Sequence, residues 1–223
     1  MTWVTFLRNK SEAFEKFKLF KAKTENECGQ KIKCLHSDTG GEFKNLCEVN
    51  GIKRQYCVAR TPQQNGIAER KNRTVQEAAR TMLLEANLSE TFWREAVSTV
   101  VYVINRAQLR VNSNKTPYEL WNERKATVDY FKNFGSKCYI KIIDDNLGKF
   151  HSRADEGIFV GYSTEKRPYK CYNKRLKKIV ESIDVTVDED IVQKLPNYEP
   201  KDEERDYLDE DTIIEESEET FQQ

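Results

Sequence analysis

The stretch TPQQNGIAERKNRT, residues 61–74, decides how the rest of the sequence is interpreted. A Thr-Pro turn leads into a helix predicted from about Gly66 to Ala86, because apolar residues recur there at helical spacing. The first turn of that helix carries one acid, Glu69, among the bases Arg70, Lys71 and Arg73. A lone acid at this place stabilises a helix N-terminus and pairs with bases one turn on. It equally fits a metal ligand beside bases that hold nucleic acid.

A second candidate acid, Asp38, follows a short predicted strand at Lys31–His36 and precedes Gly40-Gly41. The carboxyl end of a buried strand is where α/β sheets place chemistry. Asp also closes strands in ordinary Asx-turns, so its position alone leaves both interpretations open. The six cysteines are scattered without a CxxC pair and the two histidines are far apart, so a zinc site is not expected.

The first half of the sequence alternates predicted strands with amphipathic helices, as α/β domains do. Trp3–Leu7 reads as a strand, a helix follows from Ser11 to about Asn26, and Ile52–Val58 is a further strand. Two more helices are predicted, one capped by Ser89 and a short one at Thr116–Trp121. No stretch is apolar and long enough to span a membrane, so a membrane partner is not expected.

From Phe134 the pattern changes to short alternating strands, typical of a small β-barrel or sandwich. The strands are predicted at Cys138–Ile143, Ile158–Tyr162, Tyr169–Tyr172 and Ile179–Val187. Bases between Lys166 and Lys178 alternate with Tyr169 and Tyr172. Such a run is either a nucleic-acid surface or a solvated hairpin.

The zero net charge of the sequence is the sum of an acidic C-terminal segment and a basic remainder. Residues 188–223 contain 15 acids and 3 bases, a net charge of −12, whereas the other residues contain 34 bases and 22 acids, a net charge of +12. A basic body indicates a phosphate-binding surface. The acidic tail is expected to be a solubilising, disordered terminus, or else to fold back on the basic face and weaken nucleic-acid binding.

Seven motifs now stand in one order along the chain. They are KSEAFEKF at 10–17, HSDTGGEF at 36–43, NGIKRQ at 50–55, TPQQNGIAERKNRT at 61–74, KTPYELW at 115–121, FGSKCYI at 134–140 and FVGYS at 159–163. They resemble the integrase of Copia-type LTR retrotransposons over nearly all of residues 2–190. The resemblance implies an α/β ribonuclease-H-like core, incomplete at its N-terminus, at residues 1–125. A small all-β SH3-like barrel at 126–190 and an acidic tail at 191–223 would follow.

The resemblance also implies site residues. Integrases of this class use two Asp and one Glu to bind Mg²⁺ or Mn²⁺ for phosphoryl transfer to DNA. Asp38 resembles the second acid and Glu69 the third, as both catalytic and metal-binding residues. Residues expected to bind DNA are Gln63, Gln64 and Asn65, which match a mobile loop beside the site, and Arg70, Lys71 and Arg73. The implied partners are DNA and further copies of the chain as a homo-oligomer.

Three departures from the family pattern shape the expected function. The family's first Asp is expected upstream of Thr2–Leu7 and is absent from the sequence. Two strands are absent that in the family's sheet lie between the strand at Trp3 and the strand ending at Asp38, so Trp3–Leu7 is expected to have no neighbouring strand. Asp38 and Glu69 are separated by only 30 residues, fewer than is usual in the family. We therefore expect DNA integration and nucleic-acid binding by descent, with 3′-processing and strand transfer impaired or lost. The alternatives are a non-catalytic DNA- or chromatin-binding module and a non-functional transposon remnant. The expected location is the nucleus or the cytoplasm.

Overall fold

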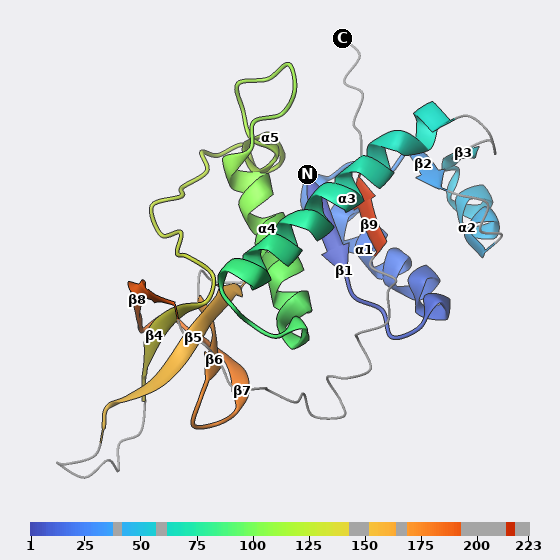
Figure 1. Ribbon diagram of the computed structural model, residues 1–223. Helices are drawn as coiled ribbons and strands as arrows, with labels where there is room; N and C mark the ends of the chain where they lie inside the picture. Colours follow the sequence, from blue (N-terminus) through green and yellow to red (C-terminus); the bar gives the residue numbers. More distant parts are fainter. Residues whose placement is uncertain (38–41, 57–61, 143–151, 164–168, 193–212, 217–223) are drawn as a thin grey trace. The chain divides into compact units, whose positions relative to one another are not determined.

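The computed structural model describes residues 1–37, 42–56, 62–142, 152–163, 169–192 and 213–216 (Figure 1). The chain divides into two compact units, one of Met1–Thr74 with Asp209–Gln223 and one of Val75–Leu208. Helix α3, Pro62–Glu85, contributes its first part to one unit and its second part to the other. The predicted domain boundary between residues 125 and 126 stays a prediction.

The first unit contains a two-stranded antiparallel sheet of β1, Thr2–Thr5, and β9, Ile213–Glu216. Val4 lies opposite Ile214, and Thr2 lies opposite Glu216. The sequence led us to expect no neighbour for this first strand and no structure in the acidic tail, and β9 differs from both expectations. Its two adjacent β-branched residues favour an extended backbone, which the unpaired edge of β1 can bind.

A small parallel sheet of β2, Cys34–Ser37, and β3, Lys53–Tyr56, also lies in this unit. Helix α2, Glu42–Asn50, joins them and ends at Gly51, which has a φ of 65°. No helix was predicted at these residues from the sequence. It forms because Leu46 and Cys47 are buried on its inner side.

Helix α1, Ala13–Cys28, follows the 3-10 turn η1, Lys10–Glu12, and ends at Gly29 with a φ of 67°. Phe17 of α1 packs edge to face on Phe43 of α2, with ring centroids 5.3 Å apart. Phe17, Leu46, Cys47 and Ile52 form the buried core of this unit. Contacts between residues of α1 and α2 therefore hold the β2–α2–β3 segment together.

The second unit begins with helices. After Thr74 the predicted apolar stripe, Val75, Ala78, Ala79, Met82 and Ala86, is confirmed in part: Val75, Ala79 and Ala86 are buried, whereas Ala78 and Met82 are half-buried. Leu83, which was not predicted, is buried as well. The 3-10 turn η2, Glu90–Phe92, leads into α4, Trp93–Ala107, with the Ser89 Oγ accepting from the Thr91 N–H as predicted. The short α5, Pro117–Asn122, begins with a capping box between Thr116 and Glu119.

Five antiparallel strands follow in the order β7-β6-β5-β4-β8. They are β4 Ser136–Lys141, β5 Ala154–Tyr162, β6 Tyr169–Asn173, β7 Lys178–Ser182 and β8 Val185–Val192. Only Ile183 and Asp184 separate β7 from β8, although these strands form opposite edges of the sheet. A two-residue connection can join the edges only if the sheet curls, so the five strands form a barrel-like structure. The single strand predicted at Ile179–Val187 is therefore two strands.

Helix α4 covers this sheet at β5. The Thr99 hydroxyl donates to the Val160 carbonyl over 3.2 Å. Gly161 makes the close approach possible, because a Cβ there would lie 2.3 Å from the Thr99 Oγ1. Inside the sheet, Phe159, Cys138 and Cys171 are fully buried beside Tyr102 of α4. The helix and the β-strands thus share one core.

The structure confirms two predictions from the sequence: the chain is of the mixed α/β class, and its all-β segment follows the helices. No helix among the described residues is both long enough and apolar enough to cross a membrane.

Candidate nucleic-acid interface

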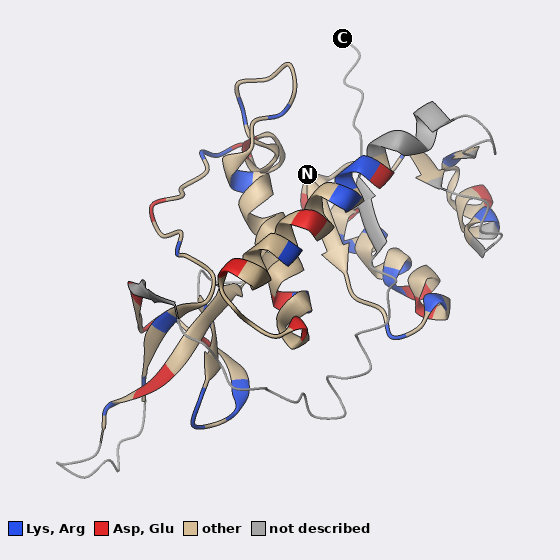
Figure 2. Ribbon diagram, in the orientation of Figure 1, with Lys and Arg blue, Asp and Glu red and all other residues tan. Residues whose placement is uncertain are grey.

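Residues 62–74 of the stretch TPQQNGIAERKNRT belong to α3, and burial is defined there from Ala68 onward. Glu69, Arg70 and Arg73 are exposed, and Lys71 is half-buried. The Thr74 hydroxyl donates to the Arg70 carbonyl over 2.9 Å, as expected inside a regular helix. Acids and bases alternate along this helix (Figure 2). The bases at positions 70, 71 and 73 are thus accessible to an anionic partner.

Gln63, Gln64 and Asn65 lie in the first turns of α3, not in the mobile loop that the family resemblance implied. The helix starts earlier than predicted, at Pro62, because a proline ring fixes a helical φ and the first helical residue needs no N–H partner. Gly66 inside a helix costs about 1 kcal/mol, which the rest of a 24-residue helix can absorb.

Of the two predicted metal ligands, Glu69 lies among the described residues and Asp38 does not. Asp38 comes directly after β2, which ends at Ser37, and lies outside the described residues. Glu69 is exposed on α3. Within the described ranges, no three His, Cys, Asp or Glu side chains lie close enough to hold a metal ion. The proposed pairing of Asp38 with Glu69 therefore stays a prediction.

The basic hairpin of β6 and β7 was predicted as one of two things, a nucleic-acid surface with stacking tyrosines or a solvated hairpin. The structure removes the tyrosines from the first interpretation. Tyr172 is buried, and the half-buried Tyr169 donates its hydroxyl to the Tyr130 carbonyl over 3.0 Å. Burial raises the pKa of the Tyr169 hydroxyl. The two rings lie on opposite faces of β6, and both faces are covered: Tyr169 packs on Phe159 and Tyr172 packs on Phe92. Lys166 and Arg167 lie outside the described residues.

Several bases of this hairpin have acidic neighbours. Lys170 lies 3.8 Å from Glu181, and Lys174 lies 3.9 Å from Glu156. Such partly exposed pairs contribute little to stability, but they reduce the local positive charge. Lys177 and Lys178 are exposed at the turn, where Lys177 has a left-handed φ of 48°. The hairpin therefore has basic character mainly at its turn.

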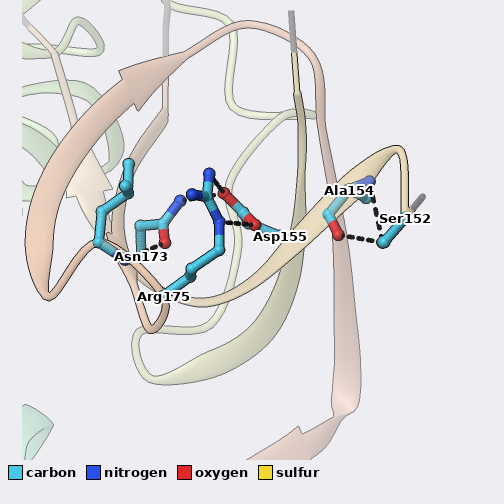
Figure 3. Close-up of polar contacts among 6 residues, drawn as sticks. Ser152, Ala154, Asp155, Asn173 and Arg175 are labelled. Atoms are coloured by element: carbon cyan, nitrogen blue, oxygen red, sulfur yellow. Dashed lines mark hydrogen bonds and ion pairs between the residues drawn. The ribbon is translucent and has the colours of Figure 1, made fainter. Parts of the chain in front are cut away.

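A polar site that was not predicted from the sequence joins Asp155, Asn173 and Arg175 (Figure 3). Asp155, at the start of β5, is only 8% exposed. Its two carboxylate oxygens accept from Nε and Nη2 of Arg175, over 2.6 and 2.7 Å. The Asn173 side-chain amide donates to the same carboxylate over 2.9 Å, and its own oxygen accepts from the Leu176 N–H. Asp155 thereby fixes the turn between β6 and β7.

Hydrogen bonding from Arg175 holds the pKa of Asp155 below its usual range, against the opposing effect of burial. The site has no local sequence signal, because Asp155 on β5 and Arg175 in the turn between β6 and β7 are 20 positions apart. We predicted that β5 begins at Ile158, which left Asp155 in a loop. The ion pair of Asp155 with Arg175, called the clamp below, orders the basic turn but also neutralises the charge of Arg175.

Comparison with known proteins gives the relationships of the chain. Residues 136–201 match the family of retroviral polymerase SH3-like domains. The chain is 35% identical over 204 residues to the retrovirus-related Pol polyprotein from transposon TNT 1-94 of Nicotiana tabacum, covering 89% of this chain and 15% of that protein. It is 31% identical over 191 residues to the corresponding polyprotein from transposon RE1 of Arabidopsis thaliana, covering 84% and 13%.

Among solved structures, the catalytic core domain of BIV integrase is similar with a TM-score of 0.36 and 22% identity, covering 55% of this chain and 85% of that chain. The chain spans about 15% or less of the length of the two plant polyproteins. The five-stranded sheet coincides with the SH3-like match. The homologues of this chain are retrovirus-related Pol polyproteins from plant Copia-type transposons.

Proposed function

We propose that this chain serves the integration step of its element and that its own contribution is DNA binding by α3. The observation that carries the proposal is the accessible group of three bases, Arg70, Lys71 and Arg73, on the solvent side of one helix. They rise only about 4.5 Å along the helix axis. DNA presents one negative charge per about 1.7 Å of its axis, so such a group can contact adjacent phosphates.

Contacts of this kind position DNA without reading its sequence. The exposed Lys177 and Lys178 of the SH3-like sheet are a second candidate contact. Glu69 is not needed for phosphate binding, because its charge repels phosphate. A non-catalytic DNA- or chromatin-binding module would therefore keep its affinity when Glu69 is replaced by Gln.

The test of DNA binding is charge reversal at all three bases, Arg70→Glu, Lys71→Glu and Arg73→Glu, in the whole chain. We expect the affinity for an LTR-end duplex to fall roughly 10- to 100-fold at about 50 mM salt. The slope of log affinity against log salt should decrease by about 2 to 3, since each lost phosphate contact removes about 0.9. Fluorescence anisotropy across a salt series measures both quantities.

The matched control reverses three exposed bases of α1, Lys16→Glu, Lys18→Glu and Lys23→Glu. It changes the net charge by the same amount, so an equal loss of affinity in both variants would reject a specific role for α3. Unchanged binding after reversal at positions 70, 71 and 73 would reject the proposal outright.

We further propose that these 223 residues alone are impaired in catalysis. They offer two of the three acids that the family resemblance implies, Asp38 and Glu69, with carboxylate oxygens of the kind that Mg²⁺ and Mn²⁺ prefer. When bound, such an ion would neutralise charge at the reacting phosphate. The group of three acids that the family uses has no counterpart among the described residues.

Assays of 3′-processing and strand transfer on LTR-end oligonucleotides, with Mg²⁺ or Mn²⁺, test this part. We expect no product above the level of an Asp38→Asn, Glu69→Gln double variant. Metal-dependent activity that Asp38→Asn abolishes would contradict impairment. A homo-oligomer and a nuclear or cytoplasmic location are further parts of the proposal.

The remaining possibility is a remnant without function. A single cooperative thermal transition followed by circular dichroism would argue against it, because an unfolded remnant gives no such transition.

A further inference from the structure

Arg106, near the end of α4, lies between two tyrosine rings. Its Cζ atom is 3.6 Å from the centroid of the Tyr102 ring and 4.3 Å from the centroid of the Tyr118 ring of α5. Its Nη1 atom also donates to the Tyr102 carbonyl over 3.3 Å. Tyr162 of β5 stacks on the same Tyr102 ring, with centroids 4.6 Å apart and 14° between the planes. These contacts form an aromatic column that connects the core of the sheet with α5.

The aromatic column ends at a second arginine. The Cζ atom of Arg124 lies 5.5 Å from the centroid of the Tyr118 ring, and the Arg124 side chain is exposed. Among the described residues, no carboxylate oxygen lies within 4 Å of the guanidinium of Arg106 or Arg124. A guanidinium stacked on a ring keeps the N–H groups at its edge for planar acceptors such as phosphate. The tyrosines therefore orient both arginines without neutralising them.

Three further bases lie around α5. Lys115 comes two residues before the helix, and the Arg110 N–H donates to the Lys115 carbonyl over 3.0 Å. Lys125 precedes Ala126, whose N–H donates to Oε1 of Glu119 in α5 over 3.1 Å. All three bases are exposed, and none forms an ion pair within the described part of the chain. Figure 2 shows basic residues in the loops on both sides of α5.

The acid inside this group of bases is occupied by the backbone. Oε2 of Glu119 accepts from the Thr116 N–H over 2.9 Å, in addition to the bond from Ala126 to Oε1. These backbone hydrogen bonds lower the pKa of Glu119, and Lys115 lowers it to a smaller extent. Residues 106–129 contain five bases and three acids. Glu119 thus caps α5 and does not pair with an arginine, and the surface keeps an excess of positive charge.

We propose that α5 and its two flanking loops form a second phosphate-binding surface, which binds the backbone of duplex DNA. Its bases are Arg106, Arg110, Lys115, Arg124 and Lys125. Bases on two loops need a partner with closely spaced charges, and DNA has one per about 1.7 Å of its axis. The inference goes beyond the proposed function, because this surface lies in the second compact unit and uses none of the bases of α3.

Charge reversal in the two loops tests the surface and leaves the aromatic column intact. In the whole chain, Arg110→Glu, Lys115→Glu and Lys125→Glu together should lower the affinity for an LTR-end duplex roughly 10-fold at about 50 mM salt. The slope of log affinity against log salt should decrease by about 2 to 3. The same three positions changed to Gln should give a smaller loss in the same direction, and this variant serves if the first one does not fold.

The matched control is the triple charge reversal on α1 described above, which changes the net charge equally. An equal loss of affinity in the α1 and α5 variants would overturn the inference, as would unchanged binding after reversal around α5. A labelled poly-glutamate peptide tests the other class of anionic partner. If reversal around α5 weakens peptide binding as much as duplex binding, the surface recognises acidic polypeptides and the inference is wrong.

Replacement of Tyr118 tests the aromatic column. Tyr118→Phe keeps the ring and should keep the affinity, whereas Tyr118→Leu removes the ring without changing charge and should lower the affinity roughly 3-fold. In an Arg106→Gln, Arg124→Gln background, Tyr118→Leu should have no further effect, because the ring acts through the arginines. Equal affinity of the Phe and Leu variants, or an undiminished loss in that background, would contradict the role of the aromatic column.

Failure of this inference and failure of the proposed function give different results. If reversal on α3 abolishes binding and reversal around α5 has no effect, the inference is wrong and the proposed function stands. If reversal around α5 weakens binding and reversal on α3 does not, the proposed function is wrong and the inference stands.

Discussion

Asp155 shows how much a single buried charge can depend on its partners. A buried carboxylate without hydrogen bonds is strongly unfavourable. Here both oxygens are bonded, by the guanidinium of Arg175 and the amide of Asn173. The guanidinium is itself 60% exposed, so the pair is only partly removed from water. We infer that Asp155 stabilises the β6–β7 turn more than it stabilises the sheet core.

Asp155→Asn should lower the free energy of unfolding by about 1–3 kcal/mol at pH 7. The pKa of Asp155 in the folded chain is lowered, so the stabilisation is complete above the unfolded value of about 3.9 and is lost as the pH falls through the lower folded value. The difference between wild type and variant should thus shrink below about pH 4. Urea unfolding between pH 7 and about pH 2 measures it.

The control for this prediction is Asp184→Asn. Asp184 pairs with Lys141 over 3.5 Å, with both side chains more than half exposed. Such a pair contributes at most about 1 kcal/mol, so its removal should cost less than that of Asp155. Equal stability of Asp155→Asn and wild type at pH 7 would refute a stabilising role for the clamp.

At the scale of elements, the decisive contact is that of α4 with β5. The Thr99 hydroxyl and the Gly161 backbone lie so close that no side chain fits at position 161. Gly161 also has a φ of 139°, where L side chains are rare. Both facts make the glycine necessary for the helix to lie on the strand.

Gly161→Ala should therefore destabilise the chain by about 2–4 kcal/mol, through overpacking and backbone strain together. Gly29→Ala is the comparison for backbone strain without overpacking, because Gly29 has a φ of 67° and nothing lies within 4 Å of its added Cβ. That variant should cost about 1–2 kcal/mol. Thermal unfolding of both variants checks the order, and an equal cost would show that the contact with Thr99 does not matter.

For the whole molecule, the features best predicted from the sequence are those set by residues close together in the chain. The buried stripe of α3 and the cap at Ser89 follow from helical spacing and from side-chain chemistry. Helix α2 was missed although Phe43, Leu46 and Cys47 have helical spacing. A helix of nine residues is marginal alone and forms here because Phe17 of α1 packs against it.

The candidate site was predictable to a lesser degree. Arg70 and Arg73 of α3 are exposed as expected and Lys71 is half-buried, whereas both tyrosines of β6 are packed and Gln63–Asn65 lie in a helix. Strand alternation predicts that Tyr169 and Tyr172 lie on opposite faces of β6, but not that both faces are covered. Asp155 with Arg175 and β1 with β9 are pairings of distant residues, and no local pattern encodes them.

The pairing of β1 with β9 also has a consequence for biosynthesis. Thr5 and Ile213 are 208 positions apart. At roughly 5–20 residues per second, a ribosome needs about 10–40 s to reach the second strand after completing the first. During that interval the edge of β1 stays open to any other extended chain, including a neighbouring nascent copy on the same message. Strand β9 therefore pairs with β1 late, and translation speed sets how long the growing chain is exposed to misassembly.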